Sequence, residues 1–193
     1  HIFDGKKSSG YLEEDSKNPI NKYGLSKFWG ELFISKYLTN YYILRTSWLL
    51  SYSGENFITK IMDKQKLKLD FNVVSDQIGI PVTSDFISRN VANILINYKT
   101  NPLPYGTFHL TPSGFFSRYE LAKITLKIAS KLNILKKSDI IYPSKIKSSE
   151  YSSKVTYPLN GVLSSRKIQK FIDIKINDSL YNLEYFIRKK YIK

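Results

Sequence analysis

The sequence has no cysteine in 193 residues. Disulfide bonds and thiolate metal sites are therefore excluded, which is typical of a cytoplasmic protein. Long apolar runs are missing too, and none approaches the ~20 residues that a helix needs to cross a bilayer. The first residues do not follow the pattern of a signal peptide. We therefore expect no membrane partner and a cytoplasmic location.

Arginine is scarce, although the net charge is +14. Proteins that recognise bases and phosphates favour arginine because its planar guanidinium can donate two parallel hydrogen bonds. Here lysine dominates, and the lysines are spread along the chain, which indicates a solvated surface. We expect no nucleic-acid partner. A basic nucleic-acid binder is the alternative, and it would show steeply salt-dependent affinity. The arginines are Arg45, Arg89, Arg118, Arg166 and Arg188.

Predicted strands alternate with predicted helices along the chain, which indicates an α/β fold with a parallel sheet. Residues 1–3 and 41–50 are expected as strands. A helix is expected from Asn18 and Pro19, an N-cap followed by proline, to about Tyr37. Residues 84–99 show helical spacing of apolar side chains. Ser117 and Glu120 form a capping box that opens another helix.

Tyr23 and Lys27 lie four residues apart in the first predicted helix, within "NPINKYGLSKFWGE". Residues at this spacing share a helix face. A neighbouring ammonium group favours the phenolate form of tyrosine, so that the tyrosine can exchange a proton with a substrate oxygen. The spacing alone is weak evidence, since about two such pairs are expected by chance in this composition. Small residues beside Tyr23 distinguish this pair from the two others in the chain.

Several further motifs occur in a fixed order around this pair. They are "FDG" at 3–5, "YLEED" at 11–15, "RTSW" at 45–48, "GENF" at 54–57 and "VSDQIGIP" at 74–81. Together with "NPINKYGLSKFWGE" they resemble the extended short-chain dehydrogenase/reductases, and within these the dTDP-4-dehydrorhamnose reductases. The resemblance covers residues 1 to about 125 well and the last third loosely.

The resemblance implies a fold, a reaction and site residues. The fold would be the C-terminal portion of a Rossmann-like parallel sheet plus a small α/β substrate-binding subdomain. Residues 1–80 would be the remaining part of the Rossmann-like domain with the Tyr-x-x-x-Lys helix, and residues 81–193 mostly the substrate-binding subdomain, with some segments returning to the Rossmann layer. Tyr23 would donate a proton to the C4 carbonyl oxygen of a dTDP-4-dehydro sugar as NADPH or NADH delivers hydride. Lys27 would hold the nicotinamide ribose and tune Tyr23, so both residues would also bind the cofactor. Trp48 would contact the sugar nucleotide.

The resemblance assigns weaker roles to other positions. Arg45 is expected to be structural and His109 to be a core histidine with satisfied hydrogen bonds. Asn56 would position substrate or cap a helix. Magnesium has Asp85 as its only candidate ligand, and one carboxylate does not make a metal site. No metal site is therefore assigned, and a homodimer is left open.

Three departures from the family pattern affect these expectations. Val82 stands where the family has threonine, and Tyr157 stands where it has an arginine near the substrate, which weakens the expectation of tight nucleotide-sugar binding. None of the nine glycines forms the Gly-rich turn that cradles a dinucleotide pyrophosphate. We therefore expect this sequence to be a C-terminal fragment that is inactive alone. The alternatives are a non-catalytic reductase-like regulatory subunit and a nucleotide-sugar epimerase or dehydratase of the same superfamily.

Overall fold

The computed structural model describes residues 1–172 and 176–192. Its helices and strands alternate along most of the chain, as predicted for an α/β protein. The helices are α1 (Lys22–Tyr37), α2 (Phe57–Lys66), α3 (Ser84–Ile96), α4 (Arg118–Lys131), α5 (Arg166–Gln169) and α6 (Ser179–Tyr191), with 3₁₀ turns η1 (Lys137–Asp139) and η2 (Ser148–Glu150). The strands are β1 (Tyr42–Arg45), β2 (Trp48–Leu50), β3 (Asn72–Val74), β4 (Ile78–Gly79), β5 (Pro81–Thr83), β6 (Gly106–His109), β7 (Phe116–Ser117) and β8 (Ser144–Ile146).

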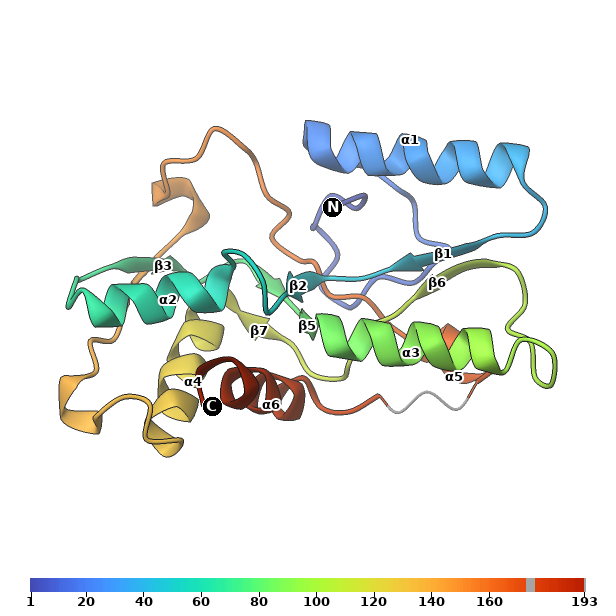
Figure 1. Cartoon of the computed structure of the whole chain (residues 1–193). Helices are drawn as coiled ribbons and strands as arrows, with labels where there is room; N and C mark the ends of the chain where they lie inside the picture. Colours follow the sequence, from blue (N-terminus) through green and yellow to red (C-terminus); the bar gives the residue numbers. More distant parts are fainter. Residues whose placement is uncertain (173–175, 193) are drawn as a thin grey trace.

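Parallel pairing dominates the described strands, which confirms the predicted fold class. β1 pairs with β6, β2 with β5 and β3 with β8, all parallel, whereas β4 and β7 are antiparallel. Helices α1 and α3 lie on opposite faces of the β1–β6 pair (Figure 1). The buried side chains between this pair and α3, among them Phe86 and Phe108, form one hydrophobic core.

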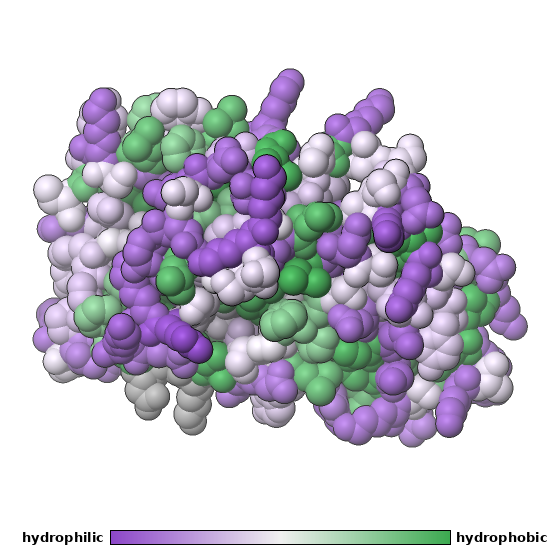
Figure 2. Space-filling view, turned by 180° about the vertical axis from the view of Figure 1, so that it is seen from behind, coloured by the Kyte–Doolittle hydropathy of each residue, from purple (hydrophilic) through white to green (hydrophobic). Residues whose placement is uncertain are grey.

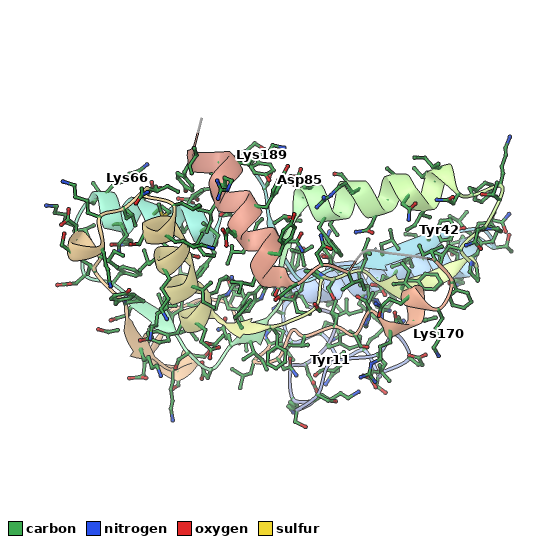
Figure 3. The ribbon with its side chains drawn as sticks, turned by 90° about the horizontal axis from the view of Figure 1, so that it is seen from below. Tyr11, Tyr42, Lys66, Asp85, Lys170 and Lys189 are labelled. Atoms are coloured by element: carbon green, nitrogen blue, oxygen red, sulfur yellow. The ribbon has the colours of Figure 1, made fainter. Side chains whose placement is uncertain are left out.

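A second core lies where α2, α4 and α6 gather at the other end of the molecule (Figure 1). Leu121 and Phe186 are among its fully buried side chains. The two ends are joined by the β2–β5 pair and by an ion pair between Asp85 of α3 and Lys189 of α6, whose charged atoms are 3.6 Å apart (Figure 3).

Several predicted boundaries are wrong. Residues 1–3 form no strand, although Ile2 and Phe3 are buried. α1 begins at Lys22, because Asn21 rather than Asn18 is its N-cap. The strand predicted over 41–50 is two strands, β1 and β2. Apolar composition marks each of these segments as buried, but tertiary hydrogen bonds decide where a strand begins and ends.

The surface has the mixed character expected from dispersed lysines. Figure 2 shows hydrophilic side chains spread over one face of the molecule, with hydrophobic patches between them. Within the described residues, no helix is long and apolar enough to cross a membrane.

Candidate active site

The N-terminus of α1 is fixed by Asn21. Its side-chain oxygen accepts a hydrogen bond from the backbone N–H of Gly24 (2.7 Å), which caps the helix. Its amide nitrogen donates to the carbonyl oxygen of Thr156 (2.8 Å). One residue therefore caps the helix that carries the predicted Tyr–Lys pair and ties it to the polar segment around residue 156.

Tyr23 and Lys27 come together as predicted. Tyr23 lies in the first turn of α1 and its side chain is 57% exposed. The Lys27 Nζ atom is 5.4 Å from the centroid of the Tyr23 ring. The edge of the ring meets the His1 imidazole, with centroids 5.2 Å apart. This arrangement leaves the phenol accessible to a ligand and places a cation beside it.

Gly24 lets α1 approach the N-terminal segment. It is the buried residue of α1, in which Phe28 and Glu31 are half-buried and the remaining side chains are exposed. A Cβ atom at this position would collide with the carbonyl oxygen of His1. Of the small residues beside Tyr23, Gly24 is thus the one that permits this close approach. Gly30 faces open space.

Arg45 of β1 and Glu31 of α1 form a buried ion pair between the helix and the sheet. The Arg45 guanidinium donates two hydrogen bonds to the Glu31 carboxylate, from Nε at 2.9 Å and from NH2 at 2.7 Å. The two side chains are only 6% and 12% exposed. Bidentate pairs of this kind combine strength with a fixed orientation. The expectation that Arg45 is structural is confirmed, and Glu31 is a partner that the sequence did not reveal.

His109 is a core histidine, but its hydrogen bonding is incomplete. Its Nε2 atom lies 3.2 Å from the Arg45 guanidinium, and because arginine only donates, Nε2 is the acceptor. The Nδ1 atom has no hydrogen-bond partner among the described residues. The Glu13 Oε2 atom is 4.0 Å away. Burial, reinforced by the Arg45 charge, lowers the pKa of His109 to about 3.

Trp48 packs tightly at the start of β2. A Cβ atom on Gly79 would collide with its indole ring, so glycine is required there for the observed approach. The guanidinium of Arg118 stacks on Trp48, and its Cζ atom is 3.7 Å from the Trp48 ring centroid. Nothing in the local sequence around Arg118 predicts this long-range contact.

Two further polar side chains, those of Asn56 and Asp76, serve local structure. Asn56 caps α2, accepting hydrogen bonds from the N–H groups of Ile58 and Thr59. Asp76 accepts hydrogen bonds from Ser148, and so fixes the turn at η2.

Metal ligands do not cluster in the described residues. No group of three or more histidine, cysteine or acidic side chains there could hold a metal ion. The one candidate for magnesium, Asp85, accepts a hydrogen bond from Tyr52 (2.8 Å) and pairs with Lys189.

A nicotinamide cofactor fits the residues only in part. The exposed phenol of Tyr23 and ammonium of Lys27 suit the nicotinamide and ribose end, where hydrogen-bond donors are needed. The sequence contains no Gly-rich turn for the pyrophosphate.

Comparison with known proteins decides the family. A family described as "RmlD substrate binding domain" matches residues 1–192. The chain belongs to this family. A dTDP-4-dehydrorhamnose reductase of Sinorhizobium fredii is 32% identical over 179 residues, which are 91% of this chain and 59% of that protein. The Bacillus subtilis spore coat polysaccharide biosynthesis protein SpsK is 30% identical over 170 residues, 88% of this chain and 55% of that protein.

Solved structures of the RmlD family share the fold. A dTDP-4-dehydrorhamnose reductase of Bacillus anthracis, solved in complex with NADP, superimposes with a TM-score of 0.84 at 26% identity. The match covers 97% of this chain and 62% of the other. The chain thus spans about three fifths of the length of the relatives it matches. The predicted relationship to the reductases is confirmed.

Proposed function

We propose that this chain is part of an NAD(P)H-dependent dTDP-4-dehydrorhamnose reductase. The reaction would convert dTDP-4-dehydro-6-deoxy-L-mannose to dTDP-L-rhamnose for cell-surface polysaccharide. The observation that carries the proposal is the Tyr23–Lys27 pair, held on an anchored helix with the phenol exposed. Membership in the RmlD family supports it.

The proposed roles follow from the chemistry of the side chains. When bound, the nicotinamide would supply hydride to the C4 carbon of the sugar. The Tyr23 hydroxyl would give its proton to the C4 oxygen, which becomes a hydroxyl. The Lys27 ammonium would stabilise the phenolate that remains and would hydrogen-bond the cofactor ribose. Trp48 would contact the sugar nucleotide.

The test is reductase activity of the whole natural protein. We expect oxidation of NADPH or NADH that depends on dTDP-4-dehydrorhamnose. The variant Tyr23→Phe keeps the ring but removes the proton donor, and we expect kcat to fall about 10²- to 10⁴-fold, the usual contribution of general acid catalysis. Tyr185→Phe, in another Tyr-x-x-x-Lys pair, is the matched control. Equal activity of Tyr23→Phe and the natural protein would exclude the proposed role of Tyr23.

A further inference from the structure

Arg118 differs from the other arginines in its surroundings. Arg45 pairs with Glu31, Arg89 donates to the carbonyl oxygen of Asp85, and Arg166 and Arg188 are exposed to water. Arg118 is partly buried, and no carboxylate among residues 1–172 and 176–192 lies within ion-pair distance of it. Its charge is therefore withdrawn from water without a described counter-ion.

Aromatic rings hold the Arg118 guanidinium in place. Its Cζ atom is 3.7 Å from the Trp48 ring centroid and 5.1 Å from that of Phe57. Stacking engages the flat faces of a guanidinium and leaves the N–H groups at its edge able to donate. Burial lowers the pKa of Arg118 to about 10, and the neighbouring Tyr157 acts in the opposite sense. The group is still a cation at neutral pH, but its surroundings do not balance its charge.

We propose that Arg118 binds the diphosphate of the nucleotide-sugar substrate. The inference rests on the proposed function and deepens it. A guanidinium edge matches two phosphate oxygens and can donate a pair of parallel hydrogen bonds to them. A bound diphosphate would also supply the negative charge that the described surroundings of Arg118 lack.

The neighbours of Arg118 favour a nucleotide sugar over a simple anion. The rings of Trp48 and Phe57 lie against the cation, and Tyr157 is close enough for its charge to act on it. Aromatic side chains beside a cation are typical of a site that takes a sugar or base together with a diphosphate. Ring contacts also lead back to the proposed proton donor. The ring centroids of Tyr157 and His1 are 6.1 Å apart, and those of His1 and Tyr23 are 5.2 Å apart.

The position of Arg118 is set by structure rather than by the ligand. Ser117 caps α4, and the backbone N–H of Arg118 donates to the carbonyl oxygen of Gln77 (3.0 Å). The side chain is therefore presented at the junction of β7 and α4 before a ligand arrives. Preorganised donors of this kind lose little conformational entropy on binding.

The test is binding of dTDP and of inorganic pyrophosphate, measured by titration calorimetry on the purified protein. We expect Arg118→Gln to weaken dTDP binding by at least about tenfold, the loss expected for a hydrogen bond to a charged group. Arg118→Lys should recover part of the affinity, because it keeps the charge but loses the planar fork. Lys127→Gln removes an exposed charge from the same helix and is the matched control.

A second readout guards against loss of folding. In a Trp29→Phe background Trp48 is the only remaining tryptophan, so dTDP should change its fluorescence directly. Circular dichroism checks that each variant is folded. If Arg118→Gln does not fold, Arg118→Lys tests the proposal alone. A contact between Arg118 and the diphosphate predicts that this variant binds dTDP more weakly than the natural protein does.

The outcomes separate this proposal from the proposed function. Weaker binding of dTDP in the Arg118 variants, with Lys127→Gln unchanged, supports it. Equal binding of dTDP by the natural protein and both variants overturns the role of Arg118 but keeps the nucleotide-sugar function. Binding of pyrophosphate that depends on Arg118, without binding of dTDP or dTDP-rhamnose, would show that Arg118 binds anions but would overturn the proposed nucleotide-sugar function. Binding of neither ligand overturns both.

Discussion

Charged groups from three parts of the chain enclose the His109 side chain. Arg45 of β1 contacts its Nε2 atom, Glu13 approaches its Nδ1 atom, and the Lys167 charge also lowers its pKa. Protonation would bury a charge in a dry environment and place it beside the Arg45 cation, and both effects are costly. His109 is therefore neutral in the folded protein over most of the pH range.

This neutrality predicts how stability depends on pH. The folded pKa is about 3, whereas unfolded histidine titrates near ~6.5, so between these values the unfolded chain binds more protons. The contribution of His109 to the free energy of unfolding is therefore fully present above pH ~6.5 and is lost as the pH falls toward 3. Between pH 3 and ~6.5 we expect the free energy of unfolding of the natural protein to rise with pH more steeply than that of His109→Gln. The difference in slope should be up to about 1.4 kcal/mol per pH unit.

Urea unfolding of the natural protein and of His109→Gln at a series of pH values measures the difference between their slopes. His1→Gln removes the other, exposed histidine and should leave the slope of the natural protein unchanged. Identical slopes for His109→Gln and the natural protein would show that the burial of His109 does not control its protonation.

Helix α1 has few contacts for a helix that carries a proposed active site. Gly24 is its buried residue, and Trp29, Phe33 and Tyr37 form an exposed stack of rings along it. An apolar pattern without a buried stripe gives this helix little packing energy within the described structure. The ion pair of Glu31 with Arg45 is therefore a main contact that fixes the position of α1, and with it the positions of Tyr23 and Lys27.

Removing Glu31 should loosen the helix. We expect Glu31→Gln to lower the free energy of unfolding by about 3 kcal/mol, because it leaves the Arg45 charge buried without its ion-pair partner. Amide hydrogens of α1 should exchange faster, while those of α4 keep their protection. Hydrogen exchange with mass spectrometry resolves the two helices.

Glu55→Gln provides the control for Glu31→Gln. Glu55 pairs with Lys60 at 3.1 Å, but the two side chains are 69% and 60% exposed. Exposed pairs contribute at most about 1 kcal/mol, so this variant should hardly change stability. An equally small effect of Glu31→Gln would mean that other contacts hold α1.

At the scale of the whole molecule, the chain holds one part of what a reductase needs. It has the proposed proton donor and the proposed diphosphate-binding cation, and it spans 59% of the length of its relative from Sinorhizobium fredii. The 193 residues contain no Gly-rich turn to bind a cofactor pyrophosphate. The division into residues 1–80 and 81–193 stays a prediction.

The 193-residue chain by itself is therefore expected to show no turnover. Tyr23 and Lys27 contact only the nicotinamide end of the cofactor in our proposal, which is too little for productive binding. The measurement is NADPH and NADH consumption with dTDP-4-dehydrorhamnose, beside a complete reductase of the family as positive control. Measurable turnover by this chain would show that a dinucleotide can bind without the Gly-rich turn.

The sequence by itself determined the α/β class, the family resemblance and the Tyr23–Lys27 pair. These depend on local patterns, namely the alternation of apolar segments, the capping residues of α4 and the four-residue spacing on a helix. Tertiary structure decided the partners of the buried charges. Glu31 meets Arg45 across 14 positions of the sequence, and Arg118 stacks on Trp48 across 70. The buried Nδ1 atom of His109 has no hydrogen-bond partner among the described residues. No local pattern encodes such contacts, because their energy depends on burial and on groups that meet only when the chain has folded.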